Sequence, residues 1–110
     1  MKKSYIKYEL FRMRRKFNPL ILFYGNNELS YEQFSSLKEY SDEIGIEFLS
    51  TAFDIPSIRF LNEIGIKRFK IPSGEITNLP YLREISMYKK PLIISTGMAE
   101  IFEIDEALKV

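Results

Sequence analysis

From about residue 28 onward, the pattern of apolar and polar positions changes regularly between two periods. Short apolar runs that are typical of strands are separated by longer stretches in which apolar residues recur at helical spacing. The expected strands cover residues 46–50, 66–71 and 91–95. Helices that alternate with short strands indicate a parallel sheet with right-handed crossovers. The pattern therefore predicts the α/β class, with about three parallel strands and flanking helices.

Local signals mark the ends of the expected helices. Ser30 with Gln33 three residues later predicts a capping box, and Gly45 stands where a C-terminal glycine belongs. Asp54 and Asn78 are the expected N-caps of the next two helices, each with a proline in its first turn. The expected apolar faces hold Phe34, Leu37, Ser41 and Ile44, then Ile58, Leu61 and Ile64, then Leu79, Leu82 and Ile85, then Ile101, Ile104 and Leu108.

An internal repeat supports this reading. Residues 42–46 (DEIGI) recur as residues 62–66 (NEIGI). Each copy contains a helix end, a glycine and a strand start, so the repeating unit is helix–strand. Three strands are too few to close a barrel, but they are sufficient for a slice of an eight-stranded one.

Polar side chains gather at the carboxyl ends of the expected strands. Successive side chains of a strand point to opposite faces. The faces suited to packing against helices hold Ile46, Phe48, Phe69, Ile71, Leu92 and Ile94. Thr51, Lys70 and Ser95 then share the inward face, and Ser73 and Glu75 follow the second strand at the same rim. Ligands of parallel α/β proteins bind at this end of the strands.

The residues alone leave two interpretations of Lys70 open. A buried ammonium group is costly unless it is paired. A phosphate or carboxylate ligand would pair it, with the neighbouring hydroxyls completing the hydrogen bonds. Alternatively, Lys70 forms a structural ion pair with Glu47 or Glu75.

The amino-acid composition excludes several kinds of functional site. The 110-residue chain has no cysteine and no histidine, which excludes disulfides, thiolate zinc sites and the commonest general base. No apolar run reaches the roughly 18 residues of a membrane span. The basic start at Met1 resembles a signal sequence, but Lys7, Glu9 and Arg12 interrupt the apolar stretch that should follow. We therefore expect a cytoplasmic protein.

Residues 1–27 differ in charge from the remainder. They hold seven Lys/Arg and one acidic residue, whereas residues 28–110 hold nine and fourteen. A helix is expected over residues 1–17, because apolar residues recur at Ile6, Leu10, Met13 and Phe17. Residues 19–24 resemble a strand. A nucleic-acid or membrane-surface role rests on charge alone, and a solvated basic face is favoured, so neither partner is expected.

Four motifs carry a resemblance to a known family. They are FLSTAFD at residues 48–54, FKIPSGE at 69–75, NLP at 78–80 and ISTGM at 94–98. In this order they resemble the sialic acid synthase family, which includes N-acetylneuraminate, legionaminic and pseudaminic acid synthases. The resemblance covers residues 28–110, and Ala52 stands where the family usually has proline. Residues 1–27 show no such resemblance.

The resemblance implies a partial TIM (β/α)8 barrel and a reaction. The family condenses phosphoenolpyruvate with an N-acetylmannosamine-type acetamido sugar to a nonulosonic acid and releases phosphate, with a divalent metal, manganese or magnesium. By similarity, Thr51, Lys70, Ser73 and Ser95 contact phosphoenolpyruvate, and Glu75 is the catalytic residue beside the reacting carbons. The family's metal-binding histidines lie on later strands, so no metal ligand is recognised in this chain.

Other family features are also missing, which indicates a central fragment of the barrel. The acidic residue of the first family strand, the lysine of the second and the C-terminal antifreeze-like domain are not recognised. The alternative is an inactive remnant, or a non-catalytic partner that completes another chain. In either case, a slice with open sheet edges is expected to self-associate.

Overall fold

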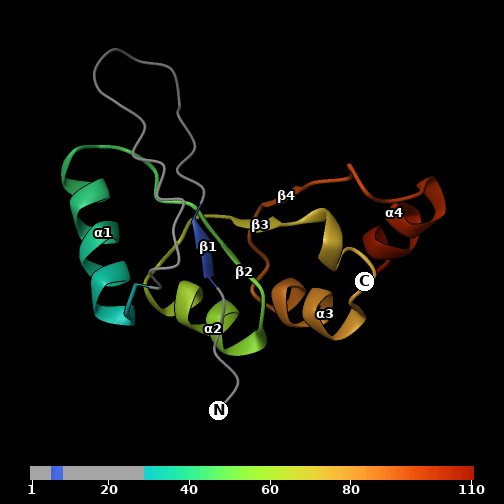
Figure 1. Cartoon of the computed structure of the whole chain (residues 1–110), viewed down its shortest axis with the longest axis horizontal. Helices are drawn as coiled ribbons and strands as arrows, with labels where there is room; N and C mark the ends of the chain where they lie inside the picture. The colour runs from blue at the N-terminus through green and yellow to red at the C-terminus, as the bar shows by residue number, and fades with distance from the viewer. Residues whose placement is uncertain (1–5, 9–28) are drawn as a thin grey trace.

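The structure is a computed structural model, and it describes residues 6–8 and 29–110 (Figure 1). From β2 onward, strands and helices alternate as the hydrophobic pattern predicts. The elements in chain order are β1 (Ile6–Tyr8), α1 (Tyr31–Glu43), β2 (Ser50–Ala52), α2 (Ile55–Glu63), β3 (Phe69–Ile71), the short 3₁₀ helix η1 (Ser73–Glu75), α3 (Leu79–Met87), β4 (Leu92–Ile94) and α4 (Ile101–Leu108).

The expected helix ends are confirmed. The side-chain oxygens of Ser30, Asp54 and Asn78 each accept a hydrogen bond from the backbone N–H three residues later. The Gln33 side chain accepts in return from the Ser30 N–H at 2.8 Å, which completes the capping box. Gly45 has φ +72°, the left-handed conformation that ends α1 and favours glycine.

Two of the strands form the expected parallel pair. In the ladder between β3 and β4, Lys70 lies opposite Ile93. β2 contacts β3, but the two are joined by no ladder; β2 pairs instead with β1, in antiparallel orientation. The strands differ from the expected bounds. β2 is Ser50–Ala52, where residues 46–50 were expected, so it contains Thr51; β3 and β4 are shorter than the expected 66–71 and 91–95.

The expectation of a helix over residues 1–17 is wrong at Ile6–Tyr8, where the chain forms β1. An unpaired strand edge presents backbone N–H and C=O groups that need partners. β1 supplies them to β2, with Ile6 opposite Ala52, so non-local pairing overrides the helical spacing. The rest of that helix and the expected strand at residues 19–24 lie outside the described residues.

The hydrophobic core lies between the strands and the helices α2 and α3, which are side by side (Figure 1). Phe69 and Ile71 are each 1% exposed, which confirms that this face of β3 packs against helices. Phe34 of α1 joins the core by edge-on contacts with Phe48 and Phe60. The buried cluster comprises Phe34, Phe48, Ala52, Ile58, Phe60, Leu61, Ile66, Phe69, Ile71, Tyr81, Leu82 and Ile85.

Candidate functional site

The carboxyl ends of β3 and β4 bring three of the predicted site residues to one edge. Lys70 is the central residue of β3, and Ser73 begins η1 shortly after this strand ends. Ser95 directly follows β4, and its N–H donates to the Ile71 carbonyl at 3.0 Å. This bond continues the parallel ladder by one step, so Ser95 is fixed beside the end of β3.

Lys70 lies on the face of β3 that points away from the core. Its neighbours Phe69 and Ile71 are buried, whereas Lys70 is half-buried. Ile93, its partner on β4, is 36% exposed. This alternation confirms that Lys70 lies on the face opposite the helix-packed one.

Thr51 occupies the neighbouring strand, β2, and is 2% exposed. Its hydroxyl oxygen Oγ1 is buried and has no hydrogen-bond partner in the structure. An unpaired buried hydroxyl is costly, and such groups are found where a ligand or water completes the bonding. Thr51 therefore has free hydrogen-bonding capacity near the end of β2.

Glu75 ends η1 and is half-buried at the same rim. Its Oε2 accepts a hydrogen bond of 2.7 Å from the Asn78 side-chain amide. The other end of that amide, Oδ1, accepts from the Tyr81 N–H at 3.3 Å and caps α3. Sequence reasoning found the cap but missed the contact with Glu75; the three-residue spacing between the two side chains was the available signal.

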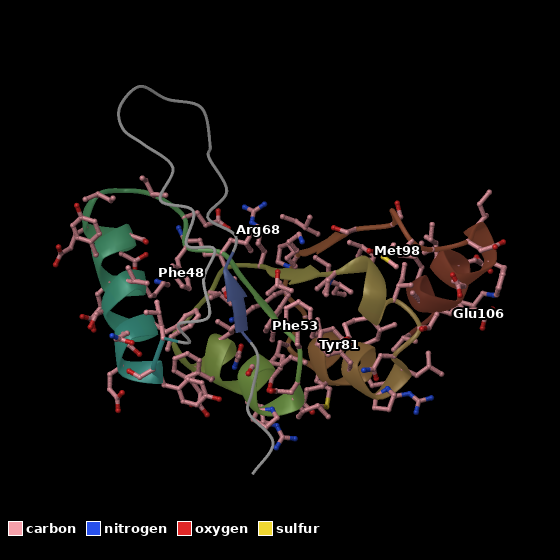
Figure 2. The ribbon with its side chains drawn as sticks, viewed as in Figure 1. Phe48, Phe53, Arg68, Tyr81, Met98 and Glu106 are labelled. Atoms are coloured by element: carbon pink, nitrogen blue, oxygen red, sulfur yellow. The ribbon has the colours of Figure 1, made fainter. Side chains whose placement is uncertain are left out.

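Tyr81 connects α3 to the end of β2, and it was not found from the sequence. Its hydroxyl donates to the Ala52 carbonyl at 2.7 Å, and the residue is 2% exposed. Tyr81 is labelled in Figure 2. Burial, followed by the carboxylates of Glu75 and Asp54, raises the pKa of Tyr81. The hydroxyl therefore stays protonated and remains a donor. The signal available in the sequence was the position of Tyr81 four residues before Ile85, on the same side of the expected helix.

Glu47 has a partner other than Lys70. Arg68 binds both of its carboxylate oxygens, with Nε–Oε1 2.5 Å and Nη2–Oε2 3.0 Å. Such two-point pairing is the strong form of this interaction. It shows that Glu47, ahead of β2, and Arg68, ahead of β3, lie side by side.

The described residues do not fit the divalent metal that the resemblance implies. Among residues 6–8 and 29–110, no group of three or more acidic side chains lies close enough together to hold a metal ion. We therefore derive no step of the chemistry from a metal. In the same part of the chain, no helix has the length and apolar content needed to cross a membrane.

Comparison with known proteins identifies several sugar-acid synthases as relatives. The chain is 53% identical over 83 residues to the N,N'-diacetyllegionaminic acid synthase of Campylobacter jejuni, a match that covers 76% of this chain and 25% of that protein. Identity to the Legionella pneumophila enzyme of the same name is 54% over 81 residues, covering 74% and 23%. Human N-acetylneuraminate-9-phosphate synthase is 31% identical over 83 residues, covering 76% and 23%. The chain thus spans about a quarter of the length of these relatives.

Solved structures show the same fold. The N-acetylneuraminic acid (sialic acid) synthetase from Leptospira borgpetersenii superposes with TM-score 0.72 and 35% identity, covering 74% of this chain and 29% of that one. The spore coat polysaccharide biosynthesis protein SpsE from Bacillus subtilis superposes with TM-score 0.70 and 36% identity, covering 74% of this chain and 23% of that one. The fold is therefore part of a sialic-acid-synthase TIM barrel. The NeuB family model matches residues 3–110, and the chain belongs to this family.

Proposed function

We propose that this chain provides the central barrel segment of a phosphoenolpyruvate-dependent nonulosonic acid synthase. The reaction joins phosphoenolpyruvate to an N-acetylmannosamine-type sugar and releases phosphate. The observation that carries the proposal is the gathering of Lys70, Ser73 and Ser95 at the joined ends of β3 and β4, with Glu75 on the same rim. Membership of the NeuB family and the names of its relatives support it.

Phosphoenolpyruvate is assigned to the face that carries Lys70. An ammonium group and hydroxyl groups suit a multiply charged anion, because charge-assisted hydrogen bonds are the strong ones. Ser73 and Ser95 supply hydroxyls from the rim, and the unpartnered Oγ1 of Thr51 supplies another from β2. Donors held in place before the substrate arrives need little reorganisation during the reaction.

Glu75 is assigned to the reaction more than to binding of phosphoenolpyruvate. A second negative charge repels a phosphate, and Glu75 lies beyond the strand end, in η1. A carboxylate there is suited to proton transfer beside the reacting carbons, at the sugar or at the attacking water. Its contact with Asn78 holds one oxygen in place.

Three further assignments belong to this proposal. A manganese or magnesium ion would be held by residues other than those described here. The division into a basic segment over 1–27 and a barrel segment over 28–110 is proposed from the change in charge and in hydrophobic pattern near residue 28; the family match begins at residue 3. The cytoplasm is the proposed location.

The test is a chimera in which residues 28–110 replace the matching segment of the Campylobacter jejuni synthase. We expect phosphate release that depends on both phosphoenolpyruvate and the sugar of that enzyme. In the chimera, Glu75→Gln should lower kcat by about one to two powers of ten while KM for phosphoenolpyruvate stays within about twofold. The matched control is Glu43→Gln, the same change at the exposed end of α1.

Two results would overturn these assignments. A folded chimera that releases no phosphate contradicts the proposed function. A Glu75→Gln chimera that loses affinity for phosphoenolpyruvate with kcat intact contradicts the role given to Glu75.

A second candidate is a non-catalytic role, in which this chain completes another one. The exposed apolar side chains around α4 favour it: Met98 is 83% exposed, Ile101 87% and Phe102 64%. The 110-residue chain assayed alone with phosphoenolpyruvate, manganese and N-acetylmannosamine is expected to release no phosphate. Sugar-dependent release by the chain alone would contradict this candidate.

A further inference from the structure

The first turn of α3 reaches two parts of the proposed site at once. Asn78 precedes this helix and contacts Glu75 after β3; Tyr81 lies three residues later and contacts Ala52 at the end of β2. The two residues are themselves joined, because the Tyr81 N–H donates to Asn78 Oδ1. Neither is assigned a role in the proposed reaction.

Asn78 does more than a helix cap requires. An N-cap needs only a side-chain oxygen that accepts from the helix N–H groups, which Oδ1 supplies. The second contact, from Nδ2 to Glu75 Oε2 at 2.7 Å, needs an amide. Aspartate and serine cap helices as well as asparagine does, but neither offers this donor to a carboxylate at the same place.

Tyr81 fixes the peptide that follows Thr51. Its buried hydroxyl donates to the Ala52 carbonyl, although the two residues are 29 positions apart in the chain. β2 has no ladder with β3, so this bond is a direct tie between the end of β2 and the helix that follows η1. The first turn of α3 is therefore connected both to Glu75, through Asn78, and to the peptide that follows Thr51, through Tyr81.

We propose that Asn78 and Tyr81 are positioning residues, which hold Glu75 and Thr51 in a fixed relation through the first turn of α3. Asn78 orients the reacting carboxylate, and Tyr81 orients the hydroxyl that contacts phosphoenolpyruvate. The inference rests on the proposed function and deepens it, since it assigns separate supports to catalysis and to substrate binding.

The experiment uses the same chimera with two single variants. Asn78→Asp keeps the cap and removes the donor, so kcat should fall about tenfold while KM for phosphoenolpyruvate changes little. Tyr81→Phe keeps the ring and removes the bond to Ala52, so KM for phosphoenolpyruvate should rise about fivefold with a smaller change in kcat. If the two residues only stabilised the fold, both variants would lower the folded fraction. They would not change kcat in one variant and KM for phosphoenolpyruvate in the other.

Each variant has a matched control. Asn62→Asp makes the same charge change at the far end of α2, where the backbone turns toward β3. Tyr88→Phe removes a hydroxyl that donates to Glu84 at 3.1 Å, at the other end of α3. Both controls are expected to keep the kcat and KM of the parent chimera.

The outcomes separate this inference from the proposed function. An inactive parent chimera overturns the proposed function; an active parent whose Asn78→Asp or Tyr81→Phe variant matches the controls overturns the positioning roles. The Asn78–Glu75 contact is also tested without activity, by urea unfolding of the 110-residue chain with Asn78→Asp and Glu75→Gln made singly and together. Non-additive effects support the contact, and additive effects overturn it.

Discussion

The two strand–helix units at the C-terminal half of the chain have similar apolar patterns and very different surroundings. In β3–α3, Phe69, Ile71 and Ile85 are each 1% exposed. In β4–α4, Leu92 is 42% exposed and Ile101 87%. α3 lies beside α2, whereas α4 lies at the edge of the molecule (Figure 1). The pattern of a unit thus predicts which face is apolar, but its neighbours decide whether that face is covered.

Figure 2 shows the same contrast in side chains. Tyr81 points into the covered region between α3 and the strands, while Met98 and Glu106 lie around α4 at the outer end. Met98, Ile101 and Phe102 are all more than 60% exposed there, so the described residues leave these apolar side chains uncovered. The β3–α3 unit therefore contributes buried apolar side chains to the core, whereas the apolar side chains of the β4–α4 unit are exposed.

The largest expected effect is on the free energy of unfolding, when one isoleucine of each unit is replaced by alanine. Ile85→Ala in α3 should lower the free energy of unfolding by about 2–5 kcal/mol, because it removes buried methylene groups and leaves a cavity. Ile101→Ala in α4 should change it by no more than about 0.5 kcal/mol, because this side chain already contacts water. Urea unfolding followed by circular dichroism at low protein concentration measures both. Equal losses would contradict the contrast between the units.

The proposed phosphoenolpyruvate site straddles the two units, which allows a second comparison in the chimera. Lys70→Ala on β3 should lower kcat/KM for phosphoenolpyruvate by about one to two powers of ten, since a charged hydrogen bond contributes about 1.5–3 kcal/mol. Ser95→Ala after β4 removes a neutral hydroxyl and should cost about two- to tenfold. Unchanged kcat and KM in the Lys70→Ala chimera would contradict the assignment of Lys70 to the phosphoenolpyruvate site.

The parts of the fold that were predictable are local. The caps at Ser30, Asp54 and Asn78 each depend on a side chain and an N–H three residues away, so their sequence signals suffice. Alternation along β3 likewise assigned Lys70 and Phe69 to opposite faces. These features need no information about distant residues.

The parts that escaped prediction depend on distant segments. β1 was missed because pairing between Ile6–Tyr8 and β2 joins residues more than forty positions apart, and no local signal carries that information. The bond from Tyr81 to Ala52 joins α3 to β2, and three elements lie between them in the chain. The two-point pairing of Arg68 with Glu47 joins residues 21 positions apart, and it was not identified from the sequence.

The exposed apolar side chains of α4 are expected to make the 110-residue chain self-associate when it is alone. Size exclusion should show species larger than a monomer, because Ile101, Phe102 and Leu108 are between 64% and 87% exposed around α4. Phe102→Glu should shift the chain toward the monomer, by about 1–2 kcal/mol of association free energy. The control is Tyr40→Glu on α1, which is 58% exposed and away from α4. A monodisperse monomer without any substitution would contradict this prediction.

The smallest expected effect is a pH dependence that distinguishes an ion pair of the covered unit from one of the exposed unit. In α3, both oxygens of Glu84 accept from Arg59, at 2.7 and 3.2 Å, and the Glu84 side chain is 8% exposed. In α4, Glu106 pairs with Lys109 at 2.6 Å, and both side chains are more than half exposed. Exposed pairs of this kind contribute little to stability.

The hydrogen bond with Arg59 lowers the pKa of Glu84 below its ordinary value of 4.5. A carboxyl whose pKa is lower in the folded state binds protons more readily when unfolded, so it stabilises the fold above its unfolded pKa. That contribution is lost as the pH falls through the folded pKa.

The difference in unfolding free energy between the natural chain and Glu84→Gln should therefore be constant down to about pH 5 and shrink below it. The same difference for Glu106→Gln should be small throughout, because solvent already screens that pair. Urea unfolding between about pH 7 and about pH 3 measures both, and a Glu84→Gln difference that stays constant over this whole range would show that Arg59 does not favour the ionised carboxylate.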